Sequence, residues 1–149
     1  MDRPLATVRQ RGAQRWTRGH PWIFKSDVLT PPDASAGVVT VEDERGRAIG
    51  TALWSPRSEI ALRLLDRDPR AVVDEGWWGE RIGRALALRG PLDGVANAWR
   101  AVHGEGDGLP SLVVDRYDRW LVVQLLSAGL EACRADILAA LAYAARPKM

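Results

Sequence analysis

The spacing of apolar residues changes near Arg70, and this change constrains the fold more than any other feature of the sequence. Before this point, short alternating or β-branched runs are separated by turn residues, a pattern that predicts strands. A short helical turn is expected within residues 10–20, ending before Pro21 because the residue before a proline avoids helical backbone. The first part therefore reads as a small β-barrel or sandwich with predicted strands at 5–8, 38–42, 48–54 and 60–65.

The second part has a different order of elements. Apolar residues recur at helical spacing between Val73 and Leu88, up to the Gly90-Pro91 pair. Strands are predicted at 98–103, 112–114 and 120–125, followed by a helix from about 130 to 145 that places Ile137, Leu138 and Leu141 on one face. The predicted fold class is thus α+β, with a small β-barrel domain at 1–70 and a partial α+β domain at 71–149. One face of the second sheet still needs covering, so we expect these residues to be the front part of a longer protein.

The composition excludes several classes of protein. Among 149 residues, 46% are hydrophobic and 27% are charged, which is a globular profile. No apolar run reaches the roughly 18 residues of a membrane span, and the N-terminus is polar and basic, so neither a membrane anchor nor a signal peptide is expected. Cys133 has no second cysteine to pair with, and two histidines cannot complete a structural zinc set, so we expect no metal and a reducing, cytoplasmic compartment.

Positive charge is concentrated at the front of the chain. The net charge is only +2, but from Met1 to Lys25 six bases face a single acid, Asp2. Most of these bases are arginines, whose planar fork suits phosphate and base edges. A GC-rich genome that replaces Lys by Arg explains the composition equally well, so composition alone does not establish RNA binding.

The segment 15–24 interleaves cations with aromatic rings, as a site for RNA requires. Core packing of Trp22 and Phe24, and a structural role for His20, are the favoured alternatives to direct RNA contacts by these rings. Arg63 has the alternative of pairing with Glu59 or Asp66. The predicted RNA-binding residues are Arg11, Arg15, Arg18 and Lys25, with Arg57 and Arg63 as weaker candidates.

The run Gly104–Gly108 has the composition of a glycine-rich phosphate loop, but a strand is predicted after it. A nucleotide site needs a helix N-terminus after the glycines to supply free amides. We therefore expect a turn between two strands, with Glu105 and Asp107 as acceptors that order it. Cys133 lacks neighbouring bases that would activate a thiol, so we expect it to pack. No catalytic, cofactor-binding or metal-binding residue is predicted.

Three motifs in this order resemble one family. They are Arg18-Gly19-His20-Pro21-Trp22-Ile23-Phe24, Trp54-Ser55-Pro56-Arg57-Ser58-Glu59-Ile60-Ala61-Leu62-Arg63, and the run from Gly104 to Pro110 continuing into Val113-Val114-Asp115-Arg116-Tyr117; Leu125-Leu126-Ser127-Ala128-Gly129 follows them. Together they span nearly the whole chain and resemble the PUA-domain-containing, S-adenosylmethionine-dependent ribosomal RNA cytosine-5 methyltransferases.

The resemblance implies a PUA domain in the first part and the start of the family's central α+β domain in the second. It also implies ribosomal RNA as partner and S-adenosylmethionine as cofactor of the full-length family member. The cofactor site and the catalytic cysteine belong to a Rossmann-like domain that this chain does not contain, and Cys133 does not match the catalytic motif. The sequence departs from the family at Gly106, where Ser is usual, and at Ser111 and Asp118, where Gly is usual.

Three other functions stay open at this point. The chain could be a stand-alone PUA module, part of another RNA-modifying enzyme such as a pseudouridine synthase, or a domain whose basic front binds an acidic protein. The oligomeric state is equally open, a homodimer included.

Overall fold

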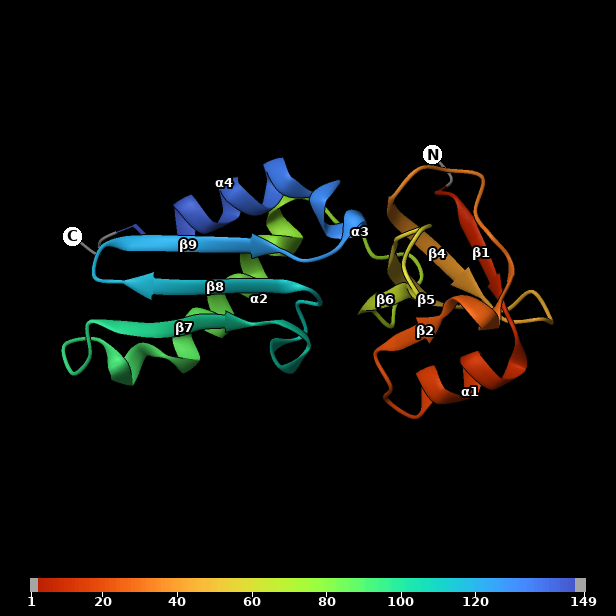
Figure 1. The fold of residues 1–149 in the computed structure, drawn as a ribbon, viewed down its shortest axis with the longest axis horizontal. Helices are drawn as coiled ribbons and strands as arrows, with labels where there is room; N and C mark the ends of the chain where they lie inside the picture. The colour runs from red at the N-terminus through yellow and green to blue at the C-terminus, as the bar shows by residue number, and fades with distance from the viewer. Residues whose placement is uncertain (1–2, 147–149) are drawn as a thin grey trace. The chain divides into compact units, whose positions relative to one another are not determined.

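The computed structural model describes residues 3–146, which form two compact units (Figure 1). The first unit runs to Ala71 and also contains Ser127–Ala132, and the second contains Val72–Leu126 and the residues from Cys133 onward. Residues 127–132, which the sequence pattern assigns to the second part, belong to the first unit. The division into domains at 1–70 and 71–149 stays a prediction.

The first unit is built on one six-stranded sheet. In chain order its strands are β1 (Leu5–Val8), β2 (Trp22–Phe24), β3 (Val28–Thr30), β4 (Gly37–Glu42), β5 (Ala48–Trp54) and β6 (Ile60–Asp66). They lie in the order β2-β6-β5-β4-β1-β3, with β1 and β4 parallel and the other neighbours antiparallel. The four strands predicted from the sequence are confirmed, and the short strands β2 and β3 are additional.

Helix α1 (Gln10–Thr17) joins β1 to β2, and a single turn of 3-10 helix, Lys25–Asp27, joins β2 to β3. The helix is polar on its outer side and buries Ala13 and Trp16. These side chains complete a core that is formed largely by the strands: Ala6, Val8, Ile23, Val39, Val41, Ala52, Trp54, Ala61 and Leu62. The helix thereby holds its arginines beside the edge strand β2.

The second unit is a three-stranded antiparallel sheet with helices on one face. The strands β7 (Ala98–His103), β8 (Leu112–Tyr117) and β9 (Trp120–Leu125) lie in chain order. Helix α2 (Glu75–Leu88) passes behind this sheet in the view of Figure 1, and α4 (Arg134–Ala144), drawn above β9, packs against α2. The predicted α+β class is confirmed, and no helix among residues 3–146 is long and apolar enough to span a membrane.

The helix predicted from 130 to 145 is wrong in one respect, because it consists of two pieces. Ser127 caps the short helix α3 (Ala128–Glu131) by accepting a hydrogen bond from the Leu130 amide at 3.2 Å. The longer helix α4 begins only at Arg134 and buries Ile137, Ala140 and Leu141. Leu138 therefore lies off the buried face, and 40% of it is exposed.

Close approach of backbone explains why a glycine stands in α3. The Gly129 amide donates to Ser55 Oγ at 3.0 Å. A Cβ at Gly129 would lie 2.9 Å from both Leu53 Cβ and the Trp54 carbonyl oxygen, too close for any side chain. Contact of α3 with the first sheet thus depends on the absence of a side chain at this position.

Within residues 3–146, two residues other than glycine have left-handed backbone. Ser111 has a φ of 61° and Asp118 has a φ of 56°. These are two of the positions at which the sequence departs from a family that usually has glycine, and both turns keep the conformation that glycine adopts without strain. Asp118 and Arg119 form the two-residue connection between β8 and β9.

Candidate nucleic-acid interface

Aromatic rings and cations meet along the edge strand β2 of the first unit. The rings of His20, Trp22 and Phe24 contact one another, with centroids 6.1–6.5 Å apart. His20 Nδ1 lies 3.2 Å from the Trp22 amide nitrogen, so the histidine braces the start of the strand. The Arg15 guanidinium lies over Phe24, 5.6 Å from the ring centroid. Trp22 and Phe24 are half-buried, which agrees with packing at the rim of the core.

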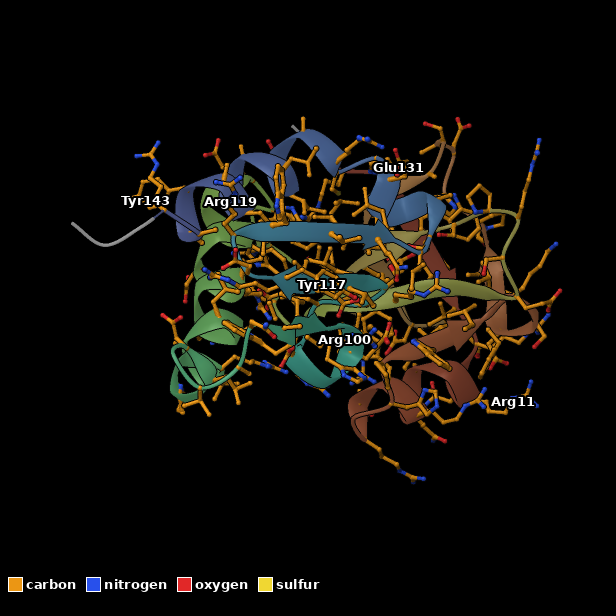
Figure 2. The ribbon with its side chains drawn as sticks, turned by 60° about the vertical axis from the view of Figure 1, so that its left-hand side comes forward. Arg11, Arg100, Tyr117, Arg119, Glu131 and Tyr143 are labelled. Atoms are coloured by element: carbon orange, nitrogen blue, oxygen red, sulfur yellow. The ribbon has the colours of Figure 1, made fainter. Side chains whose placement is uncertain are left out.

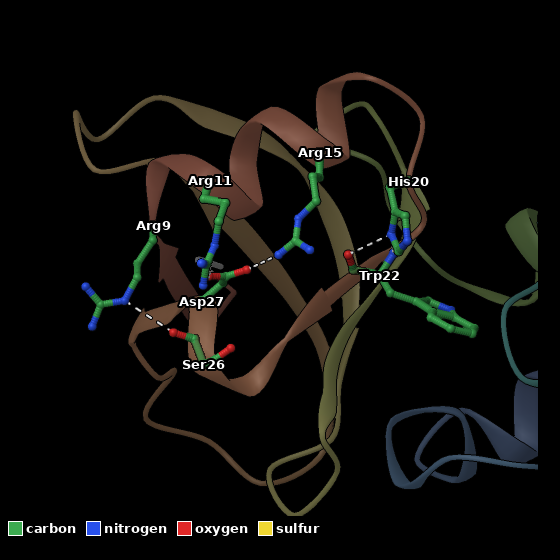
Figure 3. Close-up of polar contacts among 7 residues, drawn as sticks. All are labelled: Arg9, Arg11, Arg15, His20, Trp22, Ser26 and Asp27. Atoms are coloured by element: carbon green, nitrogen blue, oxygen red, sulfur yellow. Dashed lines mark hydrogen bonds and ion pairs between the residues drawn. The ribbon is translucent and has the colours of Figure 1, made fainter.

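Two of the predicted RNA-binding arginines are engaged inside the protein. Asp27 is fully buried and accepts hydrogen bonds from Arg11, at 2.7 Å, and from Arg15 (Figure 3). The side chain of Arg11 remains 69% exposed and that of Arg15 40% exposed. Burial opposes ionisation of Asp27, but the hydrogen bonds and charges of Arg11 and Arg15 outweigh it and lower the pKa of this carboxyl.

The other predicted residues divide into exposed cations and one buried arginine. Arg18, at the C-terminal end of α1, Lys25, directly after β2, and Arg57, in the turn between β5 and β6, are exposed. The Lys25 amide donates to the Glu59 carbonyl at 2.8 Å, which brings the Arg57 turn beside the end of β2. The expectation that Arg63 lies on the surface is wrong. Arg63 belongs to β6, which lies between β2 and β5, and stands opposite Trp22 in the strand register; only 9% of it is exposed.

Two further exposed arginines belong to this surface and were missed in the sequence analysis. Arg9 donates from Nε to the Ser26 carbonyl at 3.2 Å and otherwise projects outward (Figure 3). Arg67 follows β6 and donates to the Trp16 carbonyl at 3.2 Å, with its guanidinium near Gly19. Arg9 was already part of the basic front, whereas nothing local in the sequence places Arg67 beside α1.

The glycine-rich run of the second unit is a structural turn. Gly104–Asp107 forms one 3-10 turn and the chain then enters β8, so no helix N-terminus follows the glycines. Asp107 accepts from the His103 amide at 2.7 Å and from Arg89 at 2.8 Å, and Glu105 accepts from the Ser111 amide at 2.8 Å. The prediction that these carboxylates order the loop is confirmed. Because these carboxylates are engaged by backbone amides and by Arg89, and a strand rather than a helix follows the glycines, the loop does not fit a nucleotide or S-adenosylmethionine.

The remaining reactive groups do not assemble a centre. Burial, with a smaller contribution from Asp136, raises the pKa of the Cys133 thiol to about 11, so it stays protonated at neutral pH. Within residues 3–146, His, Cys, Asp and Glu form no group of three or more that could hold a metal ion. The surface beside β2 is therefore the best-developed candidate site in the described part of the chain.

Comparison with known proteins gives this geometry a context. Residues 6–67 match the model of the PUA-like domain. The chain is 38% identical over 129 residues to ribosomal RNA large subunit methyltransferase I of Escherichia coli and 34% identical over 128 residues to the protein of that name from Pseudoalteromonas translucida. Each alignment covers 83% of this chain and 32% of the relative, so the chain spans about a third of the length of these curated relatives.

Solved structures agree on the fold. A protein described as a SAM-dependent methyltransferase from Streptococcus mutans superposes with a TM-score of 0.83 at 16% identity, over 97% of this chain and 38% of that one. A second methyltransferase structure, complexed with SAH, gives a TM-score of 0.82 at 17% identity. The first unit is thus a PUA-like domain, and most of the chain is homologous to ribosomal RNA large subunit methyltransferase I.

Proposed function

We propose that this chain is the RNA-recognition part of a S-adenosylmethionine-dependent methyltransferase that modifies a cytosine of 23S ribosomal RNA at carbon 5. The observation that carries the proposal is a PUA-like domain with exposed cations beside an aromatic edge strand, in a chain similar to ribosomal RNA methyltransferases. The proposed location is the cytoplasm, where the ribosomal RNA substrate is found.

The proposed binding surface consists of exposed cations around β2 that bind phosphates. Arg18, Lys25 and Arg57 are its main members, with Arg9 and Arg67 beside them. Arg11 and Arg15 share their charge with Asp27 and contribute less, although their exposed sides still face solvent. The charge-based part of this interaction is independent of sequence, so selection of the target nucleotide requires more than this surface.

The salt dependence of binding to a structured 23S ribosomal RNA fragment tests the proposal. Arg18→Ala and Lys25→Ala should each weaken binding at low salt and reduce the slope of log K against log salt by about 1. Arg84→Ala is a matched control, because Arg84 is an exposed arginine of α2 that pairs with Glu80 at 2.7 Å. Absence of RNA binding at low salt, or equal effects of the three variants, would refute the assignment.

A second experiment separates recognition from catalysis. We expect no binding of S-adenosylmethionine to this chain in a calorimetric titration, because the one glycine-rich loop leads into a strand and its carboxylates are engaged. One-to-one binding with heat release would contradict the proposed division of roles.

A further inference from the structure

The second unit exposes an aromatic pair on the face of its sheet that carries no helices. Tyr117 ends β8 and Trp120 begins β9, and the two residues are direct partners across the hairpin. Tyr117 is 52% exposed, Trp120 is 65% exposed and Val122, next along this face of β9, is 48% exposed. The neighbouring residues of β8 on the opposite face, Leu112 and Val114, are fully buried. The core therefore does not account for the aromatic pair.

Cations frame this aromatic pair. Arg119, in the turn of the hairpin, places its guanidinium 5.4 Å from the centroid of the Trp120 ring. Arg100 projects from β7 on the same face and is oriented by Asp115, which accepts from its Nε at 2.8 Å. Figure 2 shows Arg100 and Tyr117 in front of the sheet and Arg119 near its hairpin end.

A hollow lies next to Tyr117 on this face. It has a volume of about 470 Å³ and its lining includes Arg100, His103, Asp115 and Tyr117. Such a volume lies within the range of about 300–1,000 Å³ that small-molecule sites occupy, so one planar heterocycle fits beside the tyrosine ring. Its polar groups point to a ligand that combines a flat face with hydrogen-bonding edges.

One arginine of this face has no acidic partner among its described contacts. Arg100 faces Asp115 across β7 and β8, and Arg119 lies in the β8–β9 turn beside Asp118, whereas Arg116 is on the opposite face of β8 with Leu112 and Val114. Arg100 neutralises Asp115, and Arg116 lies over Trp99, 5.2 Å from its ring centroid. Arg119 has the Trp120 ring as its described contact, so its charge is available to a phosphate.

We propose that this face, defined by Tyr117, Trp120, Arg100 and Arg119, is a second RNA contact that binds single-stranded nucleotides by stacking. Exposed aromatics on a sheet with flanking cations are the arrangement that splayed bases and their backbone require. One base stacks on Trp120, the next lies against Tyr117 at the hollow, and Arg119 binds the connecting phosphate. The inference rests on the proposed function, because it gives the same ribosomal RNA a second point of attachment.

Binding of a fluorescently labelled single-stranded oligoribonucleotide to the 149-residue chain tests the inference. Trp120→Ala should weaken binding about tenfold, and Tyr117→Ala by a smaller factor, because each removes a stacking surface. Trp120→Phe should restore most of the lost affinity. Arg119→Ala should reduce the salt slope by about 1, whereas Arg119→Lys should preserve the slope.

A matched control is available on the helical side of the same unit. Tyr143 of α4 is 70% exposed and has Arg146 5.0 Å from its ring centroid, the same combination of ring and cation as Trp120 with Arg119. Tyr143→Ala should leave affinity for the oligonucleotide unchanged. Circular dichroism of each variant checks that the fold is retained.

Three outcomes overturn the inference. Affinities of the Trp120→Ala and Tyr117→Ala chains within twofold of the original would exclude a stacking site, as would an equal loss in Tyr143→Ala. Sedimentation showing a dimer that Trp120→Ala dissociates would assign the face to a second copy of the chain instead. If all RNA binding is absent at low salt the proposed function fails, whereas binding that needs Arg18 and Lys25 but not Trp120 rejects this inference alone.

Discussion

Replacing Asp27 by asparagine should lower stability and strengthen RNA binding at the same time. The substitution keeps the shape of the side chain but removes the negative charge that Arg11 and Arg15 share. Removing one partner of a fully buried pair costs about 3–5 kcal/mol, because the other charge is left without compensation. Here the two arginines are 69% and 40% exposed and regain water, so we expect a loss of about 2 kcal/mol.

Urea unfolding followed by circular dichroism measures this loss. With a slope of about 2 kcal/mol per molar urea, the midpoint should fall by roughly 1 M. Glu80→Gln is the control, because Glu80 holds Arg84 at 2.7 Å in a pair whose members are 72% and 66% exposed. Such a surface pair contributes about 0–1 kcal/mol, so the control should shift the midpoint by less than half as much.

The RNA-binding readout of the Asp27→Asn chain has the opposite sign. Without the carboxylate, the charges of Arg11 and Arg15 act fully on a bound phosphate backbone, and affinity at low salt should rise about fivefold, equivalent to roughly 1 kcal/mol. A midpoint equal to that of the original chain would refute the structural role of Asp27. Weaker RNA binding in a folded Asp27→Asn chain would refute the reasoning that this acid competes with RNA for its arginines.

Three further predictions concern stability. Asp27 and Asp107 have lowered pKa values in the folded state, so their contribution to the free energy of unfolding is complete above about pH 4, the pKa of an aspartate in the unfolded chain. This contribution is lost as the pH falls through the lower pKa values of the folded state. Acid titration of the urea midpoint should show the loss, with a shallower pH dependence in Asp27→Asn. Asp118→Gly should stabilise the hairpin by roughly 0.5–1 kcal/mol in the same assay by relieving the left-handed backbone at 56°, and no gain would show that this conformation is unstrained. Gly129→Ala should destabilise the protein by about 1–3 kcal/mol by overpacking, whereas Gly79→Ala, in α2 with no atom near its added Cβ, should stabilise by up to about 1 kcal/mol; equal effects would contradict the close approach at Gly129.

The longer strands could be predicted because their apolar or β-branched residues form a local pattern, whereas β2 and β3, with three residues each, are too short to show one. The engagement of Arg11 and Arg15 could not, because Asp27 lies 16 and 12 positions away along the chain. Nothing about a lone aspartate after Ser26 indicates that a 3-10 turn will bury it against α1. Pairing of this kind arises only when the chain folds back.

Arg63 shows a second limit of sequence patterns. Alternation in β6 places Arg63 on the face opposite Leu62 and Leu64, which in an isolated ribbon faces solvent. In the folded unit β6 lies between β2 and β5, and the consecutive residues Ala61, Leu62 and Arg63 are all buried. The position of a strand within its sheet, which alternation does not encode, decided the exposure of this side chain.

The split final helix has a related cause. Helical periodicity from 130 to 145 contains no proline that would mark an end, so one helix was predicted. The break follows from two different packing partners: Gly129 of α3 fits against Leu53 and Trp54 of the first unit, whereas Ile137 and Leu141 of α4 are buried in the second unit. Tertiary packing, rather than local propensity, set the boundary.

The basic front of the chain illustrates why a count of charges overstates the phosphate contacts of a surface. Arg3 donates to Thr51 Oγ1 at 2.8 Å and to the Pro69 carbonyl at 2.6 Å, and is therefore a structural residue of the first unit. Arg11 and Arg15 are committed in part to Asp27. Of the six bases at the front, Arg9, Arg18 and Lys25 have no acidic partner among their described contacts and keep their charge for a ligand. Exposed arginines from later in the chain, Arg57 and Arg67, add to them. Each side-chain cation that contacts a phosphate contributes about 0.9 to the slope of log K against log salt. The measured slope therefore reports how many cations the folded protein leaves free to bind phosphate, rather than how many the segment contains.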